Sequence, residues 1–280
     1  MYDDYSKLTN AQQRELYKTI NKNYTKTIKD IDERVKLISK QKGKEQRQSI
    51  KAITPIIVAL WRLNGKEIIT TGESIMTDSW LFYEYSALKL QNQRILLTNK
   101  EISKMITKTL EKRMKVIKWD KVINGNAKRL DKKVRNIVAK SIKNDKTARQ
   151  IQAELEKTLK LNRGKAKAIA RTETNFYKSE SKLQVGNHHE KNGMTIIKTW
   201  VYTYLSNEHR SHHIEANGQT VIGINGLFKV GGYETTAPQH FGIASEDINC
   251  TCDYKMEYLE RVETDLNEYK RYKESKWSMK

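Results

Sequence analysis

Apolar residues recur at helical spacing along most of the first 190 positions. Over 7–40 they form one narrow stripe, which predicts a long helix suited to packing on another helix. The same periodicity predicts helices at 47–63, 78–89 and 101–117. Asn124-Gly125-Asn126 predicts a break. Three further helices are then expected at 130–142, 147–159 and 164–185.

The pattern changes near Gly193. The run 195–205 is rich in β-branched and aromatic residues, which is typical of a strand. Asn217-Gly218 predicts a tight turn before a short strand at 219–222. The fold class is therefore α+β: a mainly helical N-terminal region, a module of helices and small antiparallel β hairpins, and a C-terminal helical tail. The expected domain limits are 1–120, 121–254 and 255–280.

The formal net charge of +20 is concentrated in one segment. Residues 101–180 hold 23 Lys and Arg against 9 Asp and Glu. Such a cationic segment favours a polyanionic partner, above all nucleic acid, and the alternative is a solvated lysine-rich surface. The candidate DNA contacts are Lys128, Arg129, Lys132, Lys133, Arg135, Lys140, Lys143, Arg149, Arg163, Lys165 and Lys167.

Membrane association is not expected. The longest apolar stretch, 53–61, is much shorter than the roughly 20 residues that span a bilayer. The acidic, polar start at 1–4 predicts no secretory signal. The two cysteines are separated by a single residue, which is a poor disulfide framework, so synthesis in a reducing cytosol is expected.

Both cysteines and four of the six histidines fall between positions 200 and 254. Thiolate and imidazole together suit zinc, with His213, Cys250 and Cys252 as ligands. His212 is the preferred fourth ligand, and His209, His240 and Asp247 are the alternatives. The competing interpretation is that the cysteines pack in a core and that the histidines bond to backbone.

Enzymatic chemistry is not indicated. Arg171 and Glu173 lie two residues apart on a predicted helix and so do not pair along it. Each is expected to bond outside the helix and to tie it to the β module. The polar group from Glu208 to Glu215 suggests a nuclease, but it lacks paired acidic residues at a repeated spacing. The chain also lacks a phosphate-binding loop, which excludes a packaging motor.

Several motifs between 140 and 254 occur in a specific order, and together this order resembles the phage Mu F-like minor head protein (head morphogenesis) family. The motifs are Ala-Arg-Thr-Glu ending at Glu173, Lys198 and Trp200, Arg210 with His213, Asn217-Gly218-Gln219, Phe228 before Gly231-Gly232, and Asn249-Cys250-Thr251-Cys252. Three positions depart from the usual family pattern. Ser206-Asn207-Glu208 stands where the family has an Asp before the Arg210–His213 turn, Asn217 stands in place of Asp, and Thr251 stands in place of Arg. The expected structural motif residues are Arg171, Glu173, Trp200, Arg210, Gly218 and Asn249.

The resemblance implies a minor capsid protein of a tailed phage or prophage. Such a protein is made in the bacterial cytoplasm, enters the head of the virion in few copies and acts in head assembly, genome packaging or ejection. The implied partners are the portal protein, a scaffold or major capsid protein, and double-stranded DNA bound without sequence preference. Its His and Cys residues are the implied metal ligands. The alternative is a metal-dependent nuclease or toxin-like effector with a head-type module, although only 26 residues follow Tyr254, too few for an effector domain.

Overall fold

Contacts divide the chain into two compact units. Unit 1 comprises Met1–Arg14, Thr70–Leu110 and Ala168–Lys280, and unit 2 comprises Glu15–Ile69 and Glu111–Lys167. The computed structural model describes residues 2–91, 97–144, 146–203, 210–259, 270–271 and 273–275. The predicted domain limits at 120 and 254 follow the motifs rather than these contacts, and they stay predictions.

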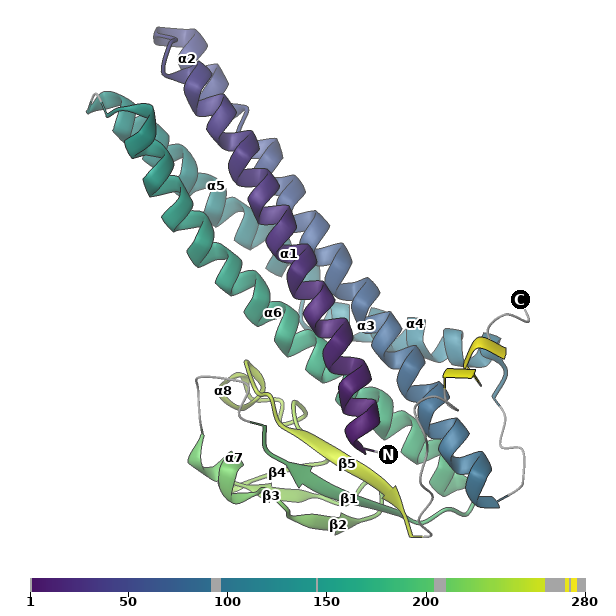
Figure 1. Cartoon of the computed structure of the whole chain (residues 1–280). Helices are drawn as coiled ribbons and strands as arrows, with labels where there is room; N and C mark the ends of the chain where they lie inside the picture. The colour runs from purple at the N-terminus through teal and green to yellow at the C-terminus, as the bar shows by residue number, and fades with distance from the viewer. Residues whose placement is uncertain are drawn as a thin grey trace. The chain divides into compact units, whose positions relative to one another are not determined.

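Long helices form most of the chain (Figure 1). Their bounds are α1 Tyr2–Ile38, α2 Gly43–Lys51, α3 Thr54–Gln91, α4 Asn99–Val116, α5 Trp119–Lys143 and α6 Ala148–Lys191. The helices predicted at 7–40 and 101–117 are confirmed as α1 and α4. The helix predicted at 47–63 is instead divided, because the turn at 52–53 separates α2 from α3.

Three other predicted boundaries are wrong. The helix expected at 78–89 is the final part of α3, and the two helices expected at 147–159 and 164–185 are the single helix α6. Asn124-Gly125-Asn126 does not break α5. The Asn126 side chain donates to the Val122 carbonyl at 2.8 Å, so the helix satisfies its polar groups there.

Unit 2 is held together by apolar stripes that face one another. Its core contains Ile20, Tyr24, Ile31, Ile57, Trp61, Leu130, Val134, Val138 and Leu155, each at most 3% exposed. Gly65 permits close packing, because a Cβ added there would meet Ile123 at 2.9 Å and Trp119 at 3.7 Å. Helices α3 and α5 therefore approach each other closely near the start of α5.

Unit 1 contains a small antiparallel sheet with the strand order β2-β1-β5. The strands are β1 Ile196–Val201, β2 Thr220–Ile222 and β5 Asp253–Tyr258, and Trp200 pairs with Tyr254 across β1 and β5. A separate hairpin pairs β3 Phe228–Val230 with β4 Tyr233–Thr235. Two short helices complete the module: α7 Ser211–Glu215 lies between β1 and β2, and α8 Ala244–Asp247 lies between β4 and β5. The mainly helical α+β class is confirmed.

Glycines at positive φ set the turns of this module. Gly193, with φ +87°, follows α6, and Gly218, with φ +84°, precedes β2, as expected. The strand predicted at 195–205 is observed as β1 and ends at Val201, and positions 204–205 lie outside the described residues. The helical tail predicted from 255 is wrong over 255–258, which complete β5, and most of 260–280 lies outside the described residues. No helix in the described part of the chain is long and apolar enough to cross a membrane.

Candidate functional site

His213 and the two cysteines form a buried cluster in unit 1. His213 lies on α7, whereas Cys250 and Cys252 immediately precede β5. The Nδ1 atom of His213 is 3.6 Å from the Cys250 Sγ atom and 3.5 Å from the Cys252 Sγ atom. All three side chains are buried. His213 thus meets two thiols that lie 37 and 39 positions further along the chain, and the three side chains supply donors to one point.

The spacing of these donors fits a tetrahedral zinc ion. Zinc binds sulfur at about 2.3 Å and imidazole nitrogen at about 2.0–2.1 Å, so a tetrahedral angle separates N from S by about 3.6 Å. The observed separations match that value. The three donor atoms lie within 4.8 Å of one another. The residues present therefore fit zinc as three of four ligands.

Glu246, on α8, contacts the ring nitrogen of His213 that faces away from the cysteines. Its Oε2 atom lies 3.0 Å from His213 Nε2 and 2.8 Å from His212 Nε2. Burial alone would raise the pKa of Glu246, but the hydrogen bonds from the two histidines outweigh it and lower that pKa. A carboxylate bonded to one imidazole nitrogen fixes the tautomer and leaves the other nitrogen free for a metal. Glu246 therefore orients His213 Nδ1 toward the cysteines.

The four candidates for the fourth ligand have different positions. His212 is grouped with Glu246 and His213 rather than with the cysteines. His240 bonds Glu180 at 2.8 Å and stacks on Phe176, and Asp247 accepts from the backbone of Phe241 and Gly242. His209 lies outside the described residues, as do Asn207 and Glu208. The assignment of His212 stays a prediction.

The two thiols are electrostatically unequal. Hydrogen bonds from the Cys252 thiol and from His213 lower the pKa of Cys250 to about 5 despite its burial. Its hydrogen bond to Cys250, together with burial, raises the pKa of Cys252. One thiolate beside an imidazole is thus favoured at neutral pH. Binding of zinc would release the second proton, because zinc coordinates thiolates.

Aromatic rings enclose the cluster. Phe241 stacks on His213 with centroids 5.5 Å apart, and Trp200 meets the same ring edge-on at 5.8 Å. Trp200 is fully buried and also contacts Phe228. These contacts remove the site from water, which suits a structural metal rather than one open to substrate.

The turn before the cysteines is held by motif residues. Asn249 has φ +58°, a left-handed conformation that asparagine tolerates, and its backbone N–H donates to Thr172 on α6 at 3.1 Å. Arg210 donates to the Ile248 carbonyl at 2.9 Å, and the Gly218 N–H donates to the Trp200 carbonyl at 2.9 Å. These residues shape the loops that carry the donors.

Helix α6 is tied to the β module by residues that the sequence analysis did not single out. Asn175 donates to the Cys250 carbonyl at 2.9 Å, and Ser179 donates to the Pro238 carbonyl at 2.8 Å. Lys178 and Lys182 both pair with Asp253 at 2.7 Å. Glu173 is buried on the same helix, and Arg171 is half-buried. The individual roles of Arg171 and Glu173 stay predictions.

The predicted DNA contacts all lie on α5 and α6 within unit 2. Helix α5 buries Ala127, Leu130, Val134 and Val138. Its other face exposes Lys128, Arg129, Lys132, Lys133, Lys140 and Lys143. Arg149 and Lys165 are exposed, and Arg163 is half-buried. Arg135 is already paired with Asp131 at 2.7 Å, and Lys167 lies over the Tyr17 ring at 5.7 Å.

Comparison with known proteins matches residues 132–255 to the family described as phage Mu protein F like protein. A relative, NAD(+)–arginine ADP-ribosyltransferase EFV of Enterococcus faecalis, is 33% identical over 105 residues, which are 38% of this chain and 20% of that protein. The aligned part of the chain thus spans about a fifth of that relative's length. No solved structure matches the chain. The segment 132–255, which holds the donor cluster and most of the candidate DNA contacts, is thus similar to phage Mu protein F like proteins.

Proposed function

We propose that the chain is a non-enzymatic minor capsid protein of a tailed phage or prophage, located inside the head and associated with the portal. The observation that carries this proposal is the family match over 132–255. The matched segment includes the His213–Cys250–Cys252 cluster and the cationic end of α5. The proposed role is head assembly together with genome packaging or ejection, with a scaffold or major capsid protein as a further partner.

The basic helices are the proposed DNA-binding surface. Lysines on the exposed face of α5 recur every one to two helical turns from Lys128 to Lys143, so they can follow a phosphate backbone. Phosphate contacts carry no sequence information, so binding is expected to be non-specific. This surface suits double-stranded DNA packed at high concentration.

Zinc is the proposed structural metal. His213, Cys250 and Cys252 would hold it, and Glu246 would fix the orientation of His213. Bound zinc would supply a cross-link between α7 and the segment before β5, in addition to the thiol–imidazole contacts and the hydrogen bond from Arg210 to the Ile248 carbonyl. In a module with short strands, such a cross-link contributes folding energy directly.

The name of the Enterococcus relative favours a second candidate function. That protein is an ADP-ribosyltransferase, and the shared 105 residues are only 20% of it. A head-type module carried by a toxin-like or nuclease effector would account for such a partial match. Incubating the purified chain with NAD+ and an arginine substrate, and with a DNA substrate plus Mg²⁺, tests this candidate.

Quantitative mass spectrometry of purified virions and empty proheads tests the leading proposal. A minor capsid protein gives a few copies per particle, and its incorporation is lost in particles assembled without portal. A Cys250→Ser, Cys252→Ser variant measures the contribution of the metal cluster to incorporation. Absence of the chain from particles, with all of it free in the lysate, would refute the proposal, and the effector candidate would then be tested first.

A further inference from the structure

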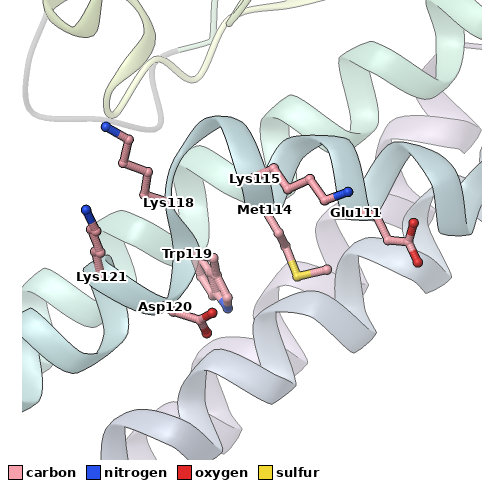
Figure 2. Close-up of a pocket in the computed structure, with 7 residues that line it drawn as sticks. All are labelled: Glu111, Met114, Lys115, Lys118, Trp119, Asp120 and Lys121. Atoms are coloured by element: carbon pink, nitrogen blue, oxygen red, sulfur yellow. The ribbon is translucent and has the colours of Figure 1, made fainter.

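Two neighbouring hollows open at the junction of α4 and α5 in unit 2, outside the set of predicted DNA contacts. The larger, whose lining residues are drawn in Figure 2, is an open depression of about 560 Å³, and small-molecule sites usually measure about 300–1,000 Å³. The smaller is also open and measures about 220 Å³. Trp119 and Asp120 line both, so the two hollows share one wall.

The junction has an unusual backbone. Helix α4 ends at Val116 and α5 begins at Trp119, and Lys118 between them has φ +52°. A residue with a Cβ atom rarely adopts the left-handed region, so the backbone is strained at Lys118. The Lys118 carbonyl accepts from Lys121 N–H at 2.8 Å and so starts α5 at this strained residue. Lys118 is one of the residues that line the larger hollow.

Cations outnumber acids around both hollows. Lys115, Lys118 and Lys121 line the larger one. Arg62 and Lys66 line the smaller one, and the two acidic residues present are Glu111 and Asp120. Within the described part of the chain, none of the three lysines forms a salt bridge. Figure 2 shows Lys118 and Lys121 extending on the same side of the helix. These exposed ammonium groups can receive phosphates.

The interior of the larger hollow has a different character. Trp119, 9% exposed, and the half-buried Met114 form its apolar part. Asp120 lines the same hollow as Trp119. An aromatic ring and a thioether accommodate the flat face of a base, and a carboxylate accepts from the amino group of a base. A smooth phosphate-binding surface would need neither feature.

We infer that these hollows bind unpaired nucleotides of a DNA strand, with a base against Trp119 and Met114 and the flanking phosphates on Lys118 and Lys121. A duplex keeps its bases stacked and paired, so it can offer this site phosphates only. The hollows therefore select a single strand or a frayed end, whereas the lysines of α5 bind any duplex. This inference deepens the proposed DNA binding and rests on it.

Binding of a fluorescent 12-nucleotide single strand and of the same sequence as a blunt duplex, measured on the full chain, tests the inference. The hollow variant is Lys118→Gly with Lys121→Gln, because glycine keeps the left-handed backbone while removing the charge. The α5-face variant is Lys132→Gln with Lys133→Gln, and Lys112→Gln, on α4 outside the hollows, is the matched single control.

The hollow variant should weaken single-strand binding about tenfold and duplex binding less than twofold, whereas the α5-face variant should weaken both. A 4-thiothymidine strand should cross-link within 114–121. Equal weakening of both DNA forms by the hollow variant, or no weakening of either, overturns the inference while leaving the proposed DNA binding intact. Failure of the unaltered chain to bind either form overturns both.

Discussion

Replacing Asp253 by Asn removes the shared counter-ion of two buried lysines. Asp253 is 5% exposed, and it receives Lys178 and Lys182 at 2.7 Å each. Lys182 is fully buried, between the rings of Tyr5 at 5.0 Å and Tyr254 at 4.8 Å. The two ammonium groups outweigh burial and hold the pKa of Asp253 far below its usual value. An amide keeps the shape but neutralises neither lysine.

The expected loss follows from these positions. Removing one partner of a buried ion pair destabilises a protein by about 3–5 kcal/mol, since the other charge stays buried without compensation. The Tyr254 carbonyl, at 2.7 Å, and the two rings still contact Lys182, but none of them carries a negative charge. We therefore expect Asp253→Asn to lower the free energy of unfolding by about 3–5 kcal/mol. Urea unfolding followed by circular dichroism measures this loss.

A matched carboxylate-to-amide control is available on the surface. Glu15 pairs with Lys18 at 2.5 Å, with side chains 68% and 73% exposed, and such pairs contribute about 0–1 kcal/mol. Glu15→Gln should therefore change stability by less than about 1 kcal/mol. Adding Lys182→Met to Asp253→Asn should recover part of the loss. A loss below about 1 kcal/mol for Asp253→Asn alone would refute the role of this buried network.

Two further predictions concern the metal and DNA. Glu246→Gln should lower zinc affinity about 10–100-fold in a chelator competition, because the amide orients His213 less strongly; unchanged affinity would contradict the role given to Glu246. The logarithm of DNA affinity should fall steeply and linearly with the logarithm of salt concentration. Lys132→Gln and Lys133→Gln should each reduce the magnitude of that slope by about 0.9. Arg135→Gln should change the slope less, since Asp131 already pairs with that guanidinium; a slope that is the same for all three variants would argue against this surface.

The sequence predicted element types better than boundaries. The apolar stripe of α5 continues through Ile123, Ala127 and Leu130, and this burial outweighs the weak helix propensity of Asn124-Gly125-Asn126. In the opposite case, the uninterrupted apolar periodicity at 47–63 concealed the turn at 52–53. Propensity is thus a poor guide wherever packing on a neighbouring helix decides the backbone.

Residues of the candidate site were predictable in proportion to their chemical specificity. His213, Cys250 and Cys252 were identified because cysteine and histidine are rare in this chain, and the structure places them together. Glu246 was missed because glutamate is common, and its contact with His213 spans 33 positions. Asp253 was missed for the same reason, since nothing local shows that Lys178 and Lys182 converge on it. Contacts between residues that are far apart in the sequence can be identified only from the three-dimensional structure.

Buried lysines and tyrosines together should give stability a maximum in alkaline solution. Burial lowers the pKa of Lys182 and of Lys198 to about 8, against about 10.4 in an unfolded chain. Lys198 is enclosed by three backbone carbonyls, those of Ile224, Gly226 and Thr236, at 2.6–2.8 Å. Between pH 8 and about 10 these two lysines therefore bind more protons in the unfolded chain than in the folded one, and this contribution raises stability as pH increases. Each lysine contributes at most about 1.4 kcal/mol per pH unit.

Above about pH 10 the sign reverses. Burial raises the pKa of Tyr5, Tyr83, Tyr254 and Tyr258 above the ordinary tyrosine value, so only the unfolded chain loses these protons. The folded chain then binds more protons, and stability falls with further increase in pH. Urea midpoints between pH 7 and 11 should therefore peak near about pH 10. Lys198→Met should reduce the rise of the urea midpoint below about pH 10 and leave its fall above that pH unchanged. Urea midpoints that decline steadily from pH 7 would show that the two lysines are not desolvated as the structure indicates.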